Sequence, residues 1–259
     1  MEFPLIVHQT WKNNTIPDRW KPLYDVWISF CQAFGYKHVL WTDDENRAMI
    51  EKYYPWFLTK YDSYRYPIQR ADAVRYFILH KYGGVYSDLD MCPKKDKFQK
   101  LHELILHFGH SALSAMPITK NKVWKDTLTN SFMISQPHSP FMERLWESLM
   151  NPTKFHWTWI KIPLRALHKF EILLTTGPGI VSDQSLLHPK LVKSIPLNLI
   201  GNPSADTCLM DHEQGGSWHD PQQMQKDLYR LVFVSIVVVL FLVLFVFFIL
   251  RATKRRSKK

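Results

Sequence analysis

Residues 69–90, QRADAVRYFILHKYGGVYSDLD, combine a helical pattern, a glycine pair and two aspartates. Apolar residues recur on one side of a helix over residues 69–82. Gly83 and Gly84 are expected to end this helix, because glycine adopts the left-handed conformation at a helix C-terminus without a Cβ clash. The short, β-prone run at residues 85–87 predicts a buried strand. The segment therefore predicts a helix, a sharp turn and a strand.

Asp88 and Asp90 end this unit. Side chains alternate along a strand, so both carboxylates are expected on the same side, where two oxygen ligands can hold one divalent cation. The chain contains fifteen aspartates, so about one Asp-x-Asp is expected by chance and the motif alone is unspecific. A solvated strand end, or a structural ion pair between Asp72 and Arg75 on a neighbouring helix face, explains the same residues.

The segment resembles the signature of the glycosyltransferases named for a sugar-binding region with a DxD motif. These include fungal mannosyl-inositol-phosphorylceramide synthases and initiating α-1,6-mannosyltransferases. The similarity extends to VHQTWK at residues 7–12 and HEQGGSWH at residues 212–219, in the same order. The resemblance implies an α/β domain of the glycosyltransferase A (GT-A) type over residues 1–220.

The implied activity is metal-dependent, retaining transfer of a hexose from a nucleotide sugar. GDP-mannose is the first expectation for the donor and a UDP-hexose the alternative, with Mn²⁺ or Mg²⁺ as cofactor. The expected acceptor is a membrane lipid such as inositol-phosphorylceramide, for which an aromatic loop at residues 155–163 is suited, or else a glycan or glycoprotein. A regulatory subunit is a further expected partner. A membrane-tethered protein that binds a nucleotide sugar without catalysis is the alternative from another class.

The resemblance also implies roles for single residues. Asp72 would contact hydroxyls of the donor sugar, Arg75 the sugar or phosphate, and Asp88 and Asp90 the ribose and the metal. A carboxylate accepts hydroxyl hydrogen bonds, and a guanidinium binds anionic oxygens in a forked geometry. His212 would complete the metal site, with His219 as the fallback, because imidazole suits manganese-like ions.

Further contacts to the nucleotide or sugar are expected from loops at both ends of the domain. Trp11 can equally be a core side chain, Asn130 a residue of a β-edge, and residues 212–219 a glycine turn before a linker. The expected contact residues are His8, Gln9, Thr10, Trp11, Trp41, Asn130, Gly177, Ser217 and Trp218.

The other predicted elements follow from local pattern. Thr42 and Glu45 form a capping box, which predicts the start of a helix. Residues 55–66 are expected to be irregular. The predicted strands are residues 4–8, 37–41, 111–116 and 130–135, and the predicted helices are 16–34, 98–108 and 140–150.

Charge and cysteine content exclude several classes. The net charge is +10, but the last nine residues hold six of the 33 basic side chains, and without them 27 basic side chains face 23 acidic ones. The small net charge of residues 1–250 does not indicate nucleic-acid binding. The three cysteines are widely spaced and form neither a zinc pattern nor a disulfide framework.

Residues 231–250 contain no charge and no proline and are flanked by Arg230 and Arg251. Twenty residues whose only polar member is Ser235 match the thickness of a bilayer core, which predicts one transmembrane helix after a linker at residues 221–230. The basic tail at residues 251–259 favours a cytosolic C-terminus and a lumenal body in the Golgi or endoplasmic reticulum. No signal peptide is recognisable before Pro4, so a body facing the cytosol stays open.

Overall fold

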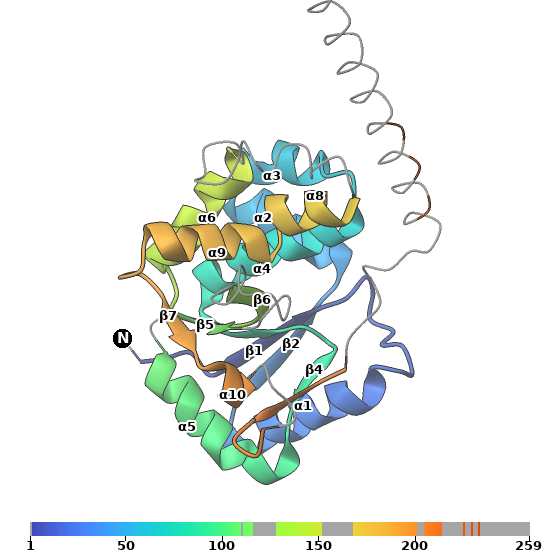
Figure 1. The fold of residues 1–259 in the computed structure, drawn as a ribbon. Coiled ribbons are helices and arrows are strands. Elements are labelled where there is room, and N and C mark those ends of the chain that lie inside the picture. Colours follow the sequence, from blue (N-terminus) through green and yellow to red (C-terminus); the bar gives the residue numbers. More distant parts are fainter. Residues whose placement is uncertain are drawn as a thin grey trace, which may run out of the picture.

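The computed structural model describes residues 2–109, 111–115, 128–151, 168–200 and 205–213, with single positions at 225, 229 and 233. These residues form a mixed six-stranded sheet with helices on both faces, beside a separate two-stranded ribbon (Figure 1). The strands are β1 (Ile6–Thr10), β2 (Lys37–Trp41), β3 (Gly84–Ser87), β4 (Met91–Pro93), β5 (Ser111–Ala115), β6 (Leu128–Ser135), β7 (Lys193–Ile195) and β8 (Met210–His212). The helices are α1 (Lys21–Phe34), α2 (Asp43–Tyr53), α3 (Pro55–Asp62), α4 (Pro67–Tyr82), α5 (Phe98–Phe108), α6 (Pro140–Met150), α8 (His168–Thr175), α9 (Pro178–Leu187) and α10 (Leu197–Ile200), with a 3₁₀ turn at Lys95–Lys97.

The strand order in the large sheet is β2-β1-β3-β6-β5-β7. β1 is parallel to both β2 and β3, whereas β6 is antiparallel to its neighbours β3 and β5. From β1 the chain first adds β2 on one side and then β3 on the other, so the strand order reverses at β1. In open α/β sheets, ligands bind outside the carboxyl ends of the strands at such a reversal. The fold therefore places a candidate site at the ends of β1 and β3.

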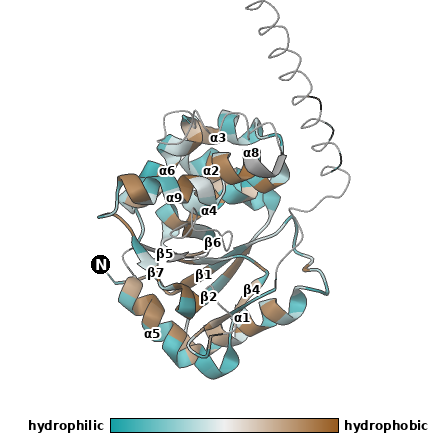
Figure 2. Cartoon of the chain, in the orientation of Figure 1, coloured by the Kyte–Doolittle hydropathy of each residue, from teal (hydrophilic) through white to brown (hydrophobic). Residues whose placement is uncertain are grey.

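The core consists of one layer of side chains on each face of the sheet. Val85 and Tyr86 of β3 point to opposite faces, as do Phe132 and Met133 of β6, because side chains alternate along a strand. Helices α2, α3, α4, α6 and α9 lie over one face, and α1 and α5 lie across the other (Figure 1). Figure 2 shows that α1 and α5 carry both apolar and polar surface, as expected for helices with one exposed side.

Most local predictions are confirmed. The strand at residues 37–41 and the helix at residues 98–108 have the predicted bounds. Thr42 and Glu45 form the predicted capping box at the start of α2. The first helix begins at Lys21 rather than at residue 16, and the first strand runs to Thr10, which places Gln9 and Thr10 in β1 rather than in a loop.

The prediction of an irregular segment at residues 55–66 is wrong, because α3 occupies most of it. Pro55 stands in the first turn, where its missing N–H costs no hydrogen bond. Phe57 and Tyr61, four residues apart, are buried in the core. Burial of this aromatic face in the folded chain, rather than local propensity, explains the helix.

Gly83 and Gly84 turn the chain directly from α4 into β3. Gly83 has φ 65° and ψ −160°, so the predicted left-handed helical conformation is wrong, although the glycines do end the helix. Gly84 has φ 89°, and a Cβ there would lie 2.4 Å from the carbonyl oxygen of Ile6. The absence of side chains lets β3 approach β1 closely at the start of the strand.

Among the described residues, no helix is long and apolar enough to cross a membrane. The predicted transmembrane segment at residues 231–250 lies outside the described residues except for Phe233, so it stays a prediction. The aromatic loop at residues 155–163 and the basic tail also lie outside them.

Candidate functional site

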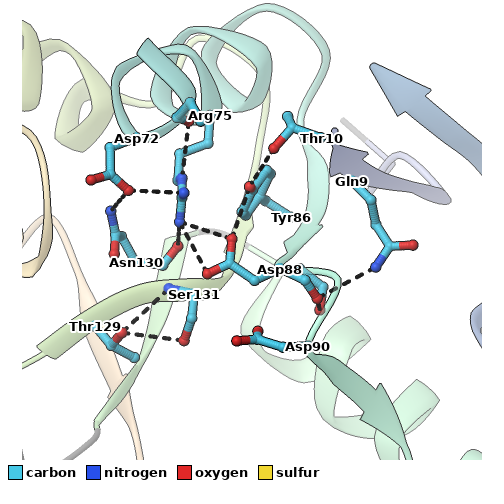
Figure 3. Close-up of polar contacts among 12 residues, drawn as sticks. Gln9, Thr10, Asp72, Arg75, Tyr86, Asp88, Asp90, Thr129, Asn130 and Ser131 are labelled. Carbon is cyan, nitrogen blue, oxygen red and sulfur yellow. Dashed lines mark hydrogen bonds and ion pairs between the residues drawn. The ribbon is translucent and has the colours of Figure 1, made fainter. Parts of the chain in front are cut away.

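The candidate site is built where β1 and β3 end. Asp88 directly follows β3, and its backbone N–H donates to the carbonyl oxygen of Ser131 at 2.8 Å, which extends the pairing of β3 with β6. Thr10 ends the neighbouring β1. Figure 3 shows these ends facing the middle of α4, from which Arg75 and Asp72 reach down toward the sheet.

Arg75 lies at the centre of the site. Its guanidinium pairs with Asp72 Oδ1 at 2.8 Å and with Asp88 Oδ1 at 3.1 Å, and it donates to the carbonyl oxygen of Asn130 at 2.9 Å. Its central carbon lies 4.7 Å from the centre of the Tyr86 ring, within the range of a cation–π contact. Burial acts to lower the pKa of Arg75, but the charge of Asp88 and the other neighbours raises it overall. The cation is therefore held by a complete set of partners.

Asp72 has no exposed surface. Its Oδ1 accepts from Asn130 at 3.1 Å as well as pairing with Arg75, and its Oδ2 accepts from Thr176 at 3.4 Å. Burial raises the pKa of Asp72, while Arg75 and the two hydrogen bonds act to lower it. The ion pair that the sequence offered as a structural alternative is thus present, inside a network that joins α4, β6 and Thr176, the residue that follows α8.

Asp88 lies between this network and solvent, with 30% of its side chain exposed. Its Oδ1 accepts from the Tyr86 hydroxyl at 3.0 Å, which leaves the Tyr86 oxygen to accept from Thr10 at 2.9 Å. Burial raises the pKa of Asp88 to about 6, against the lowering effect of Arg75. Thr10, Tyr86 and Arg75 together fix the orientation of this carboxylate.

Asp90 and His212 form a second pair on the ribbon of β4 and β8. Met91 is paired with His212 in this ribbon, and the N–H of Glu213 donates to the carbonyl oxygen of Asp90 at 2.8 Å. His212 Nε2 lies 3.6 Å from Asp90 Oδ2, with 17% and 20% of the two side chains exposed. The neighbouring carboxylate of Asp90 raises the pKa of His212. Pairing of the two short strands β4 and β8 thus brings two of the three predicted metal ligands together, Asp90 and His212.

The donor set of the predicted metal site fits a divalent cation in kind. A carboxylate and an imidazole lie side by side in Asp90 and His212, and both are ligands for manganese-like ions. Asp88 instead faces Arg75 and Tyr86, and within the described part of the chain no three His, Cys, Asp or Glu side chains gather closely enough to hold a metal ion. The three-ligand site therefore stays a prediction, with the Asp90 and His212 pair as its formed part.

Three of the predicted nucleotide contacts use their polar atoms within the protein. Trp41 donates its indole N–H to His8 Nδ1 at 3.1 Å, and His8 Nε2 donates to the carbonyl oxygen of Gly83 at 3.0 Å. Gln9 accepts from His38 Nε2 at 2.9 Å and donates to the carbonyl oxygen of Asp88 at 3.4 Å. These contacts hold β1, β2 and the end of β3 together beneath the site.

The other predicted contacts are at or near the site. Trp11 follows β1, is half-buried, and its indole N–H has no hydrogen-bond partner among the described residues. Asn130 is buried beside Arg75, and Gly177 precedes the first turn of α9. Ser217, Trp218 and the fallback ligand His219 lie outside the described residues.

Sequence reasoning missed Tyr76 and Tyr86, whose hydroxyls join the network. Tyr76 donates to the carbonyl oxygen of Thr176 at 2.7 Å and accepts from Asn130 at 3.0 Å. Tyr86 stands two residues before Asp88, on the same side of the strand, and this spacing was the available signal. No local pattern identifies Tyr76, because its partners are 54 and 100 residues away.

A six-stranded α/β sheet with an Asp-x-Asp loop at its strand reversal agrees with the GT-A type of domain that the sequence predicted. Residues 17–107 match the family described as "Glycosyltransferase sugar-binding region containing DXD motif". The whole chain is 31% identical over 276 aligned residues to inositol phosphoceramide mannosyltransferase 1 of Schizosaccharomyces pombe, of which it covers 76%. The chain belongs to this glycosyltransferase family, as the sequence predicted.

Two further similarities support the assignment of the fold and the family. Inositol phosphoceramide mannosyltransferase 2 of the same yeast is 34% identical over 69% of this chain, but the chain spans only 45% of that relative's length. The ligand-free glycosyltransferase domain of the YGT toxin has a TM-score of 0.51 at 10% identity, over 75% of this chain and 80% of the toxin domain. The predicted α/β fold of the glycosyltransferase type is confirmed by this likeness.

Proposed function

We propose that this chain transfers a hexose from a nucleotide sugar to a membrane lipid, with mannose from GDP-mannose as the first donor and an inositol-phosphorylceramide lipid as the acceptor class. The observation that carries the proposal is the 31% identity along the whole chain to a protein named inositol phosphoceramide mannosyltransferase 1. The position of the Asp-x-Asp loop at the strand reversal supports it, because this is where such sheets bind their ligands.

The charges of the site explain why such a transfer would need a cation. Arg75 is already paired with two carboxylates, Asp72 and Asp88, and Asp90 adds a third. A diphosphate brought to this loop would meet more negative than positive charge. Asp90 and His212, with Asp88, would hold Mn²⁺ or Mg²⁺, and a bound ion would neutralise charge on the leaving diphosphate.

The remaining residues orient the donor. Arg75 and Asp72 hold Asn130, which would contact the sugar, and Thr10 and Tyr86 fix the Asp88 carboxylate. Trp11 offers a half-buried ring at the end of β1 for the base or ribose. Retention of anomeric configuration is part of the proposal.

We also propose that residues 231–250 anchor the chain in the membrane, with the catalytic body in the lumen of the Golgi or endoplasmic reticulum. Twenty residues without charge, followed by a basic tail, support this placement. An anchor of this kind would keep the active site near a lipid acceptor.

The test is a panel of sugar nucleotides, offered to the purified chain with and without Mn²⁺ and followed by calorimetry and by transfer to lipid. GDP-mannose should bind only with the metal and be consumed with an inositol-phosphorylceramide acceptor. If the chain transfers mannose only to oligosaccharide, the acceptor is a glycan and the proposed lipid acceptor is wrong. A chain that binds donor but transfers to nothing would overturn the enzymatic proposal.

Variants of the loop test the metal residues. Asp88→Ala with Asp90→Ala, and separately His212→Ala, should abolish metal-dependent transfer while the thermal unfolding curve stays cooperative. Asp211→Ala is the matched control, since Asp211 adjoins His212 but points to the other side of β8, where it is 54% exposed and pairs with Lys94. Full turnover by the loop variants would contradict the metal site.

A further inference from the structure

We propose that Tyr76 is a positioning residue, which orients the side chain of Asn130 so that its amide oxygen faces the donor sugar. The inference rests on the proposed sugar transfer and assigns a function to a residue for which the sequence predicted no role. Tyr76 adjoins Arg75 in α4, is fully buried, and acts through Asn130 rather than by touching the sugar.

The direction of each hydrogen bond follows from chemistry. The Tyr76 hydroxyl lies 2.7 Å from the carbonyl oxygen of Thr176, and a carbonyl can only accept, so the phenol proton points there. The phenol oxygen is then left as an acceptor. Thr176 is itself held by its N–H, which donates to the carbonyl oxygen of Ile172 at 3.1 Å.

This leaves one favourable orientation for the Asn130 amide. Its Nδ2 donates to the Tyr76 oxygen at 3.0 Å and to Asp72 Oδ1 at 3.1 Å, so both of its hydrogens are used. Asp72, paired with Arg75, is also an acceptor at this atom. A flipped amide would place its oxygen against two acceptor oxygens and lose both hydrogen bonds.

The amide oxygen of Asn130 consequently lies on the opposite side from Asp72, as Figure 3 shows. An amide oxygen accepts from hydroxyl groups and repels phosphate oxygens, so its ligand is a sugar hydroxyl. The backbone of Asn130 is fixed independently, because its carbonyl oxygen accepts from Arg75 at 2.9 Å. Adjacent residues of α4 therefore hold the two parts of Asn130, Arg75 the backbone and Tyr76 the side chain.

A double-mutant cycle on the full chain in detergent micelles tests this role. Tyr76→Phe keeps the ring but removes the acceptor, and it should lower kcat/KM for the donor about tenfold, the size expected for one hydrogen bond. The loss should appear mainly as a higher KM. Asn130→Ala should cost at least as much, and adding Tyr76→Phe to Asn130→Ala should cost nothing more, because Tyr76 acts through Asn130.

Tyr64→Phe is the matched control. Tyr64 is also a buried tyrosine, but its hydroxyl has no hydrogen-bond partner among the described residues, so its removal should leave the kinetics unchanged. Losses that add in the double variant, or an equal loss from Tyr64→Phe, would overturn the positioning role. All variants are compared well below their unfolding temperatures, so that unfolded protein does not lower the measured kcat/KM.

A panel of monodeoxy donors gives a second readout that needs no change at Tyr76. One hydroxyl should exist whose removal costs the wild type about tenfold but costs Asn130→Ala nothing, as expected when a single hydrogen bond is lost. If removal of each hydroxyl lowers kcat/KM equally in the wild type and in Asn130→Ala, the inference fails while the proposed function stands. If no sugar nucleotide is turned over by the wild type, the proposed function fails first.

Discussion

At the scale of single residues, Arg75 shows how a buried charge is made tolerable. Its guanidinium contacts Asp72, Asp88 and the carbonyl oxygen of Asn130, and only 4% of its side chain is exposed. Removing one partner of such a pair leaves the others charged and buried, which costs far more than losing a surface ion pair. This contrast can be measured within the same chain.

Arg75→Met should lower the free energy of unfolding by about 3 to 5 kcal/mol, because two carboxylates lose their cation. Arg47→Met is the control, since Arg47 pairs with Asp62 at 2.8 Å on the surface, with 46% of its side chain exposed. Its loss should cost much less than the loss of Arg75, because an exposed ion pair contributes little to stability. Denaturant-induced unfolding measures both values, and equal effects would contradict the buried network.

His8 gives the fold a dependence on pH. Its Nδ1 must keep a lone pair to accept from Trp41, so the imidazole is neutral in the folded protein. Burial lowers the pKa of His8 from 6.5 to about 4, and burial lowers the pKa of His38 to about 4 as well. Between these values the unfolded chain binds protons that the folded chain does not, so stability is lost as the pH falls from 6.5 toward 4.

We therefore expect His8 to contribute a fall of up to about 3 kcal/mol in the free energy of unfolding over this range, while Asp88, whose pKa is raised to about 6, acts in the opposite direction. His8→Asn, which keeps an acceptor near Nδ1, should lower stability at pH 7 and remove this contribution from the slope, leaving the parts due to His38 and Asp88. Urea unfolding at a series of pH values measures this slope. An unchanged slope in the variant would show that His8 does not titrate as described.

At the scale of elements, the turn from α4 to β3 determines where the Asp-x-Asp loop lies. Gly83 and Gly84 both have positive φ, and β3 passes so close to β1 that no Cβ fits at Gly84. The helix carries Asp72 and Arg75, and Asp88 directly follows the strand, so this turn sets the distance between Asp88 and the two helix residues. The glycine pair, which was predicted only to end the helix, thus also positions Asp88 relative to Asp72 and Arg75.

Gly84→Ala should destabilise the protein by several kcal/mol or prevent folding, because the new Cβ would lie 2.4 Å from the carbonyl oxygen of Ile6. Gly35→Ala separates this clash from backbone strain alone. Gly35 has φ 71° at the end of α1, with nothing within 4 Å of a Cβ, so its change should cost about 1 to 2 kcal/mol. Thermal unfolding of both variants checks the order, and equal losses would contradict the close approach.

Local pattern predicted elements whose signal lies within the element. The capping box of Thr42 and Glu45 was sufficient to predict the start of α2, because it depends on residues three positions apart. Helix α3 was missed because its aromatic residues are stabilised by packing against α2 and α4. Packing of this kind cannot be predicted from the residues of the helix alone.

At the scale of the whole molecule, the charge is distributed unevenly along the chain. The net charge of +10 owes six positive charges to the last nine residues, beyond the apolar residues 231–250. The membrane anchor proposed there and the catalytic body would then be separate units joined by residues 221–230. We therefore expect the catalytic body to fold without the membrane anchor.

Deletion of residues 231–259 should yield a soluble protein that unfolds cooperatively and still binds the nucleotide sugar with metal. The physical reason is that, among the described residues, both core layers are formed by residues between Phe3 and Met210. Analytical ultracentrifugation and calorimetry of the truncated chain measure this, with the full chain in detergent as the reference. An aggregated product without donor binding would show that the boundary is wrong.

Elements with strong local periodicity, the Asp-x-Asp loop and membership of the glycosyltransferase family could all be predicted from the amino-acid sequence. Which side chains meet became known from the folded chain: Asp72 with Asn130 and Thr176, Tyr86 with Thr10, and Asp90 with His212. The reason is that a helix or turn depends on neighbours along the chain. A buried polar network instead depends on strand order and on the pairing of distant strands, which no short stretch of sequence contains.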